Sequence, residues 1–257
     1  KYYFYNLVYI CRIEICMAKT NKTLRRRNEY QIYDVPIDSF FELAFSIDCV
    51  VFGYGKKDLQ VLLTQRGAEP YKGLWALPGD LVYPDEDLDT SAGRVLKALT
   101  SLPDLNFEQV HTFGAVDRHP LGRVVTVAYY AIVNMKGFNP KAAFWADKAK
   151  WHSVKNLPKL AFDHRDIIDY SYKKLKESTM TKPLWNGVIE EKFTLTQLQS
   201  FFETVLDKKF DKGNFRKKID LFQYVKETEE FEKDVPYRPS RLFKFDKKLY
   251  QKNEESS

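Results

Sequence analysis

The segment Leu77–Leu102 (LPGDLVYPDEDLDTSAGRVLKALTSL) holds a dense set of groups that could do chemistry. Its first half carries five carboxylates, at Asp80, Asp85, Glu86, Asp87 and Asp89. Because Mg²⁺ is a hard cation that takes oxygen ligands, acids crowded in this way could in principle hold a metal ion against a phosphate group. One hypothesis for this chain is therefore a metal-dependent hydrolase.

A second set of polar and aromatic groups lies on the loops that adjoin this segment. It comprises Arg66, Glu69, Trp75, Asp117, Arg118 and Arg123. Asp117 and Arg118 stand at a predicted strand end, where a loop can change shape. Paired acids and arginines suit hydroxyl-rich ligands such as sugars, because both groups form bidentate hydrogen bonds. We expect these six residues to bind a small-molecule effector, although a structural salt bridge would explain any single one equally well.

A third set lies in the stretch Asp207–Ile219 (DKKFDKGNFRKKI), where six bases face two acids. Phe215 and Ile219 mark a buried helical stripe, which turns the polar residues between them outward. Asparagine and arginine can read base edges, and lysine neutralises phosphate. The residues expected to contact DNA are Lys212, Asn214, Arg216, Lys217 and Lys218 on this helix, with Arg241 and Lys244 on a later strand. A solvated basic helix is the alternative.

The first two sets need a scaffold, and the pattern from Phe40 to Ser178 predicts mixed strands with helices packed outside them. Strands are expected at residues 43–52, 59–65, 107–116, 123–133 and 144–151, and helices at residues 88–102 and 165–177. The first two strands form a predicted hairpin. The segment 66–84 is rich in glycine and proline, so we expect a shaped loop there without regular structure.

The third set needs a different scaffold. A connector at residues 178–192 is the expected pivot between the two blocks. Thr196 and Gln199 form a capping-box pattern at the start of one helix, and Asp211 is a good N-cap for the next. Short strands are expected at residues 223–226 and 241–245. Two helices with a turn, followed by a two-stranded ribbon, are typical of a winged helix-turn-helix domain.

The composition sets limits on both hypotheses. The 257 residues carry 41 lysines and arginines against 35 acids, a net charge of +6 that permits a nucleic-acid partner without demanding one. Three scattered cysteines argue against a disulfide scaffold and favour the cytoplasm. The aromatic head, residues 1–16, is too short to span a bilayer and lacks a cleavage site, so we expect no membrane partner. Either that head precedes a true start at Met17, or it is a docking arm.

The segment Leu77–Leu102 resembles the Nudix box, whose pattern is Gly, five residues, Glu, seven residues and then Arg-Glu-x-x-Glu-Glu-x-Gly. Glu86 and Arg94 match its first Glu and its Arg, while Asp80 replaces its first Gly. Apolar residues replace the three helix glutamates, namely Val95, Ala98 and Leu99. The resemblance implies a loop braced by Glu86 and Arg94. Because the family holds Mg²⁺ with those glutamates, it also implies no hydrolysis, no catalytic residue, no metal ligand and no cofactor.

The two blocks together, with the phrases FDH (Phe162–His164) and FTLTQLQSFFE…FDKGNFRKKI, resemble the NrtR-type transcription regulators. Within that family the likeness is greatest to the AraR-like, pentose-sensing branch. The resemblance implies an α+β fold, in which an N-terminal Nudix α/β/α sandwich precedes a C-terminal winged helix-turn-helix domain. It also implies a homodimer on palindromic operator DNA, controlled by a small effector. We expect a pentose such as arabinose, with ADP-ribose as the other candidate.

The expected domains follow from these elements. They are a tail at 1–39, a Nudix-like sensor at 40–178, a linker at 179–192, a winged helix domain at 193–250 and a tail at 251–257. Two other functions stay open. A Nudix-family hydrolase of ADP-ribose or of another nucleoside diphosphate derivative would require ligands among the acids near the box. An inert interaction module would show no preference for a palindrome.

Overall fold

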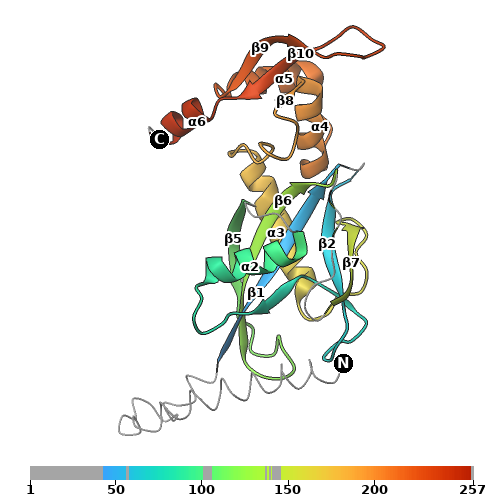
Figure 1. Ribbon diagram of the computed structural model, residues 1–257, viewed down its shortest axis with the longest axis vertical. Coiled ribbons are helices and arrows are strands. Elements are labelled where there is room, and N and C mark those ends of the chain that lie inside the picture. Colours follow the sequence, from blue (N-terminus) through green and yellow to red (C-terminus); the bar gives the residue numbers. More distant parts are fainter. Residues whose placement is uncertain are drawn as a thin grey trace.

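The computed structural model describes residues 43–55, 58–100, 106–136, 138, 140 and 146–255. In this part of the chain, a large mixed sheet lies between helices α2 and α3, and a smaller block of helices with a three-stranded sheet lies at one end of it (Figure 1). An α/β/α sandwich followed by helices and a ribbon confirms the predicted fold class.

The large sheet contains seven strands in the order β3-β2-β1-β6-β5, with β4 paired to β1 and β7 paired to β2. Their bounds are Ala44–Tyr54 (β1), Gln60–Arg66 (β2), Trp75–Ala76 (β3), Gly79–Leu81 (β4), Phe107–Phe113 (β5), Val124–Asn134 (β6) and Ala146–Ser153 (β7). Strands β1 and β6 run parallel along their whole length, and the other pairings are antiparallel. The predicted hairpin is confirmed, although β1 and β2 pair only around Phe52. Nearer the start of β1, residues Ser46 to Asp48 pair with β4 instead.

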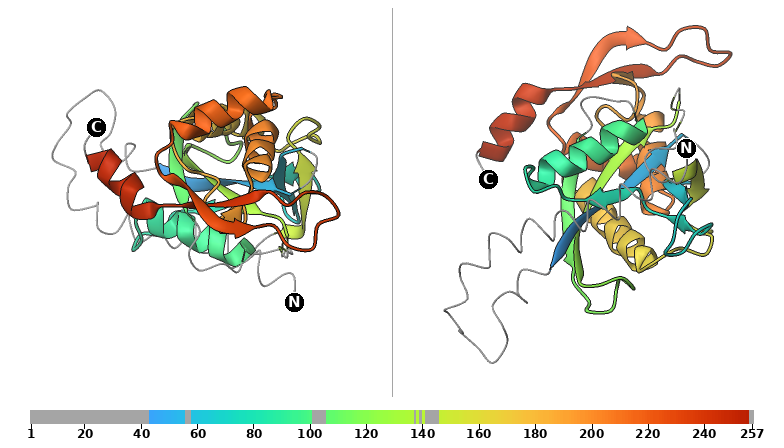
Figure 2. Two further views of the ribbon diagram at one scale, coloured as in Figure 1. Left: turned by 90° about the horizontal axis from the view of Figure 1, so that it is seen from above. Right: turned by 60° about the horizontal axis from the view of Figure 1, so that its bottom comes forward.

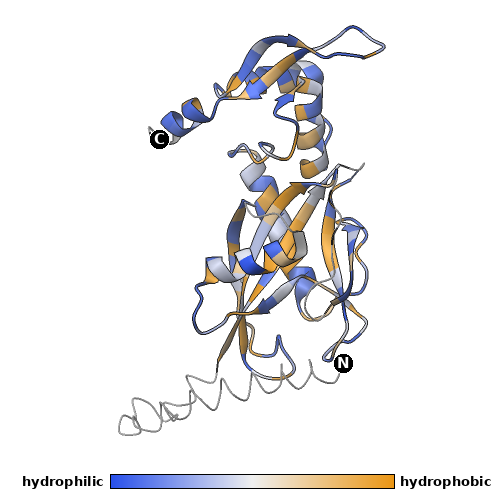
Figure 3. Ribbon diagram, in the orientation of Figure 1, coloured by the Kyte–Doolittle hydropathy of each residue, from blue (hydrophilic) through white to orange (hydrophobic). Residues whose placement is uncertain are grey.

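Both faces of the sheet are covered, and β1 shows this most clearly. Ile47, Cys49 and Val51 point toward α2, while Val50 and Phe52 point toward α3. A strand buried on both faces reads as a continuous apolar run, which is why this segment was recognisable. Helix α2 (Leu88–Thr100) contributes Ala92, Val95 and Leu96 to one core, and α3 (His164–Thr179) contributes Ile167, Ile168 and Leu175 to the other. Figure 3 shows hydrophobic residues along the strands of the sheet and a mixture of hydrophobic and hydrophilic residues on the helices that cover it.

The smaller block contains the predicted pair of helices and the ribbon. Its elements are β8 (Lys192–Phe193), α4 (Leu195–Leu206), α5 (Lys212–Asp220), β9 (Val225–Phe231), β10 (Arg241–Phe245) and α6 (Lys247–Glu255). The apolar face of α4, including Phe201 and Phe202, is buried with Phe215 and Ile219 of α5. The β9–β10 ribbon extends beyond these helices (Figure 2).

Four expectations on local structure were wrong. The segment 66–84 contains β3 and β4, because its backbone completes ladders with β2 and β1. The capping box of α4 is formed by Thr194 and Gln197, which exchange hydrogen bonds of 3.1 and 2.7 Å, instead of Thr196 and Gln199. Strand β9 continues well past residue 226. Helix α6 was not expected, and it crosses the predicted boundary at residue 250.

The connector between the two blocks is packed against both of them. Trp185 is 1% exposed and contacts the rings of Phe193 and Phe245. The Asn134 side chain, at the end of β6, donates a hydrogen bond to the Val188 carbonyl at 2.8 Å. The apolar core therefore continues from the sheet into the winged helix through this connector, and its role as a pivot stays a prediction.

Several expectations fall outside the described residues. They concern the tail 1–39 with the head 1–16, the end of the first predicted helix at residues 101–102, the first residues of the strand at 144–151, and the last two residues of the chain. None of the helices in the part that is described combines the length and hydropathy of a bilayer span.

Candidate ligand cleft and DNA-binding surface

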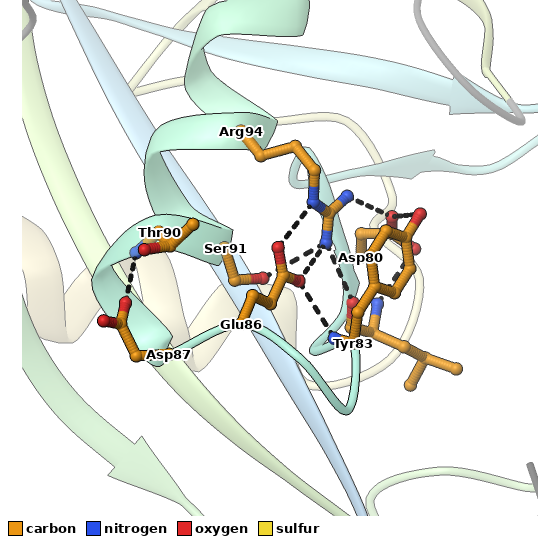
Figure 4. A network of polar contacts seen from close by, with 8 residues as sticks. Asp80, Tyr83, Glu86, Asp87, Thr90, Ser91 and Arg94 are labelled. Carbon is orange, nitrogen blue, oxygen red and sulfur yellow. Dashed lines mark hydrogen bonds and ion pairs between the residues drawn. The ribbon is translucent and has the colours of Figure 1, made fainter.

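Arg94 on α2 is the centre of a polar network in the Nudix-box segment (Figure 4). Its guanidinium donates to both carboxylate oxygens of Glu86, at 2.6 and 3.0 Å, and to Asp80 at 2.6 Å. It also donates to the Leu81 carbonyl at 3.1 Å, and the Tyr83 ring lies 3.9 Å from Cζ. The brace that the resemblance implies is therefore present, and Asp80 joins it.

This network fixes the charge state of Glu86. Hydrogen bonds from the Arg94 guanidinium and, at 2.9 Å, from the Tyr83 backbone N–H lower the pKa of Glu86 to about 2. Both carboxylate oxygens thus have protein donors, and they hold the loop 80–86 against α2.

The remaining acids of the segment are dispersed. Asp87 accepts from the Thr90 backbone N–H at 2.7 Å, and Asp89 accepts from the Tyr129 hydroxyl at 2.6 Å. Val95 is fully buried in the core under α2, and Ala98 is half-buried, while the side chain of Leu99 lies outside the described residues. Within the described ranges, no three His, Cys, Asp or Glu side chains come together in a group that could hold a metal ion.

A cleft of about 530 Å³ opens on the α3 side of the sheet. Its lining comes from the loop after β2, the end of β5 with the loop that follows it, and the residues around the start of α3: Tyr71, Phe113, Gly114, Ala115, Asp117, Arg118, Phe162, Asp163 and Asp166. Asp117 and Arg118 were predicted from the sequence. The cleft combines aromatic rings with carboxylates, which is the lining expected for a ligand that has both a ring and hydroxyl groups.

Arg118 is buried at the base of this cleft. It forms a bidentate pair with Asp163, with N–O distances of 2.8 and 2.6 Å, and lies 3.5 Å from Asp48 on β1. Asp48 accepts from the Thr126 hydroxyl at 2.8 Å. Asp163 is the residue before α3 begins, so Arg118 ties the start of that helix to the sheet.

His164, the next residue, completes the buried network. Its Nδ1 accepts from the Leu77 backbone N–H at 2.8 Å, and its Nε2 lies 3.5 Å from Asp48. Burial lowers the pKa of His164, so this ring is neutral near pH 7 and carries its proton on Nε2. Gly79 lies against Asp48, where a Cβ would come within 2.4 Å of the carboxylate.

Phe162 forms an aromatic wall of the cleft. The His119 ring stacks on it at 5.1 Å, the Tyr71 ring meets it edge-on at 4.9 Å, and Arg66 Cζ lies 4.9 Å from its centre. The Arg66 Nε also donates to the Pro70 carbonyl at 2.6 Å. Arg66 thus borders the cleft through Phe162 instead of lining it.

The other predicted effector residues lie elsewhere. Arg123 donates to the Gly114 and Ala115 carbonyls at 2.7 and 2.9 Å and so shapes the wall of the cleft from behind. Trp75 packs against the ring of His152 and Glu69 is exposed, and neither belongs to the lining of the cleft. The sequence reasoning missed Tyr71, Phe113, Phe162, Asp163 and Asp166 as lining residues. For Phe162 and Asp163 a signal existed, because both belong to the FDH phrase.

The basic helix α5 has the predicted orientation. Lys212, Asn214, Arg216 and Lys217 are exposed, and Lys218 is half-buried. The Asp211 side chain caps the helix by accepting from the Asn214 backbone N–H at 2.9 Å. The Lys218 Nζ donates to the Met180 sulfur, just beyond α3, at 3.7 Å.

Arg216 and Arg241 come together at one carboxylate of the ribbon. Glu227 on β9 lies 2.9 Å from Arg241 and 3.8 Å from Arg216. Lys244 is exposed further along β10. Glu227 thus links a side chain of α5 to a side chain of β10.

Comparisons with known proteins agree with this architecture. The NUDIX domain family matches residues 43–171, and the NrtR DNA-binding winged helix domain family matches residues 187–245. The ADPR responsive transcriptional repressor NtrR of Acinetobacter baylyi is 32% identical over 221 residues, which cover 84% of this chain and 86% of that protein. The chain belongs to the NrtR family of transcription regulators.

Two further proteins are similar to this chain, one a regulator and the other an enzyme. The crystal structure of the NrtR of Shewanella oneidensis with a 27mer DNA superposes with a TM-score of 0.66 at 28% identity, covering 78% of this chain and 93% of that one. An ADP-ribose pyrophosphatase of Methanocaldococcus jannaschii is 32% identical over 154 residues, which cover 59% of this chain and 83% of that enzyme. The Nudix domain of this chain is thus similar both to a transcription regulator and to an enzyme.

Proposed function

We propose that this chain is a transcriptional repressor of the NrtR family whose Nudix domain binds ADP-ribose and whose winged helix binds operator DNA. Helix α3 carries the proposal, because it joins the two sites. Asp163, just before α3, and Asp166 in its first turn line the cleft, while α3 packs against α4 and Met180, just beyond its other end, contacts Lys218. A ligand that shifts the start of α3 can therefore alter the position of the recognition helix.

The cleft supports a nucleotide-sized effector. Its volume of about 530 Å³ falls within the usual range for small-molecule sites. Tyr71, Phe113 and Phe162 offer ring faces and edges to a base, and Asp117 and Asp166 offer acceptors to ribose hydroxyls. The relative from Acinetobacter baylyi is named as ADPR responsive. A free pentose such as arabinose stays the alternative effector.

We infer that the Nudix domain acts as a sensor without hydrolysis. Val95, Ala98 and Leu99 occupy positions where the Nudix pattern has glutamates, and Val95 is enclosed by apolar side chains. Glu86 is held by Arg94. A carboxylate at position 95 would have to enter this core unpaired, which is unfavourable.

For DNA, we propose that the exposed residues of α5 enter the major groove. Asn214 and Arg216 would read base edges there, while Lys212, Lys217, Lys218, Arg241 and Lys244 would contact phosphates. A homodimer would present two such helices to palindromic half-sites one helical turn apart, or a multiple of it. The match to an NrtR crystallised with DNA supports this arrangement.

The test is a selection followed by a titration. The wild-type protein is used to enrich a duplex, the operator duplex, from a random-sequence library. Fluorescence anisotropy then measures its Kd at fixed salt, with ADP-ribose, arabinose or xylose added. We expect ADP-ribose alone to weaken binding. If arabinose or xylose alone releases the operator duplex, a pentose and not ADP-ribose is the effector. Failure to enrich any duplex would refute the regulator function.

The second candidate function is ADP-ribose hydrolysis, which the similarity to the Methanocaldococcus jannaschii enzyme favours. It predicts Mg²⁺-dependent release of AMP and ribose phosphate that Glu86→Gln abolishes. We expect no turnover above a protein-free control. Turnover lost in this variant would establish the enzyme instead.

A further inference from the structure

One carboxylate of the ribbon bridges two separate DNA-facing elements. Arg216 belongs to the recognition helix α5, and Arg241 begins β10 of the ribbon. The Arg241 Nη1 lies 2.9 Å from Glu227 Oε2, and the Arg216 Nη2 lies 3.8 Å from Glu227 Oε1. Each oxygen of Glu227 thus faces a different arginine, through a hydrogen bond from Arg241 and a longer ion pair with Arg216.

Arg241 is also held from a second side. Its Cζ lies 5.3 Å from the centre of the Phe231 ring, its cross-strand partner in the β9–β10 ladder. Arg216 forms an ion pair with Glu227, and its side chain is 64% exposed. Glu227 is therefore the contact that orients the helix arginine from the better-fixed strand arginine.

The chemistry of the two groups leaves both arginines able to bind DNA. A guanidinium has five N–H donors in a fixed fork, and one carboxylate oxygen engages only part of the fork. An arginine that is already oriented loses less side-chain freedom when it meets a matching base. A carboxylate beside the groove also repels the phosphates of DNA that offers no such match. Both effects increase the preference for operator DNA over random DNA more than they increase the affinity for DNA in general.

We propose that Glu227 is a positioning residue that fixes Arg216 against Arg241 and thereby sets the preference for operator over random DNA. This inference rests on the proposed function. It concerns the ratio of two affinities, because loss of an acid from a DNA-binding surface should by itself strengthen binding to any sequence.

The experiment compares three variants with the wild-type protein. Glu227→Gln keeps the shape and removes the charge, and Glu227→Asp keeps the charge and withdraws it from the arginines. Glu229→Gln is the matched control: Glu229 is an exposed glutamate two residues further along β9, and in the part of the chain that the structure describes it forms no ion pair with an arginine. Anisotropy gives the Kd for the operator duplex and for a random duplex of equal length, at several salt concentrations.

We expect Glu227→Gln and Glu227→Asp to lower the operator-to-random preference by about tenfold, the scale of one misread base contact. Glu229→Gln should shift both Kd values in parallel and keep the ratio. All melting temperatures should stay close to wild type, because these side chains are exposed.

Two results would overturn the proposal. If Glu227→Gln keeps the wild-type ratio, as Glu229→Gln does, then Glu227 contributes only charge. If Glu227→Asp keeps the ratio while Glu227→Gln does not, then charge and not position sets the preference. Both results presuppose a wild-type preference and leave the regulator function intact. A wild-type protein without any preference would instead refute the proposed function, and the role of Glu227 with it.

Discussion

Arginine–carboxylate clusters occur in both domains, and they differ in exposure. In the Nudix domain the Arg94 side chain is 24% exposed, and its partners Glu86 and Asp80 are 8% and 4% exposed. In the winged helix, Arg216, Arg241 and Glu227 are all between 43% and 64% exposed. Similar side chains therefore hold the fold together in one place and remain available to a partner in the other.

The physical reason lies in desolvation. A buried carboxylate that loses its arginine is left as an unpaired charge, so each member of the first cluster depends on the others. Exposed pairs are solvated whether or not they are formed, and they contribute little to stability. Substitutions in the two clusters should thus affect different properties, namely folding in the first and DNA binding in the second.

The largest effect is expected from Arg94→Ala. It leaves Glu86 and Asp80 without their shared cation and should cost about 3 kcal/mol of unfolding free energy. The control is Arg165→Ala, which breaks the exposed pair with Asp169 and should cost less than about 0.5 kcal/mol. Urea unfolding measures both. Equal losses in the two variants would show that the Nudix-box network does not support the fold.

Acidification should also destabilise the Arg94 cluster, by less than Arg94→Ala does. The pKa of Glu86 is lowered to about 2 from an ordinary value of 4.5, so its contribution is complete above pH 4.5 and is lost as the pH falls toward 2. Glu86→Gln cannot titrate at this position. The stability difference between wild type and this variant should therefore shrink over that interval, and a constant difference would refute the assignment.

Met180→Ala should affect communication between the domains. It removes the contact of the α3 end with Lys218 while leaving the lining of the cleft and the exposed face of α5 unchanged. We expect each separate affinity to stay within about twofold, and the change of operator Kd on addition of ADP-ribose to fall toward one; such couplings typically amount to 1–3 kcal/mol. The exposed Glu177→Ala on the last turn of α3 is the control, and it should retain the full response.

The smallest effect is expected from Lys217→Ala on the exposed face of α5. Loss of one phosphate contact should weaken operator and random DNA alike, by about three- to tenfold, and reduce the salt slope by about one. Lys173→Ala, an exposed lysine on α3, should change neither value. A selective loss of operator binding would mean that Lys217 reads bases.

The fold was predictable from the sequence wherever a periodic pattern of apolar residues coincided with a helix-capping residue or a turn. The helical repeat from Leu198 to Val205 and the cap at Asp211 identified both winged-helix helices. The strand expected at residues 223–226 ends earlier than β9 does. Glu227, Glu229 and Glu230 have low strand propensity, and their pairing with β10 keeps this segment extended. For α4, two overlapping capping patterns compete, and the sequence alone does not decide between Thr194 and Thr196.

The candidate site was predictable only in part, because its contacts join distant segments. Arg118 was recognised as a polar residue at a strand end, but its partner Asp163 lies 45 positions away in the chain. Trp75 and Glu69 were chosen for their residue types, and neither is among the residues that line the cleft. The brace of Glu86 and Arg94 was predictable because its spacing follows a known pattern.

The central claim is that ligand and operator DNA bind to one linked system. Calorimetry can test it by measuring the Kd of ADP-ribose for the free protein and for the protein saturated with the operator duplex. Linkage requires the two values to differ by the same factor by which ADP-ribose changes the operator Kd, and we expect ADP-ribose to bind the free protein more tightly. Equal ADP-ribose affinities with and without operator DNA would contradict the account.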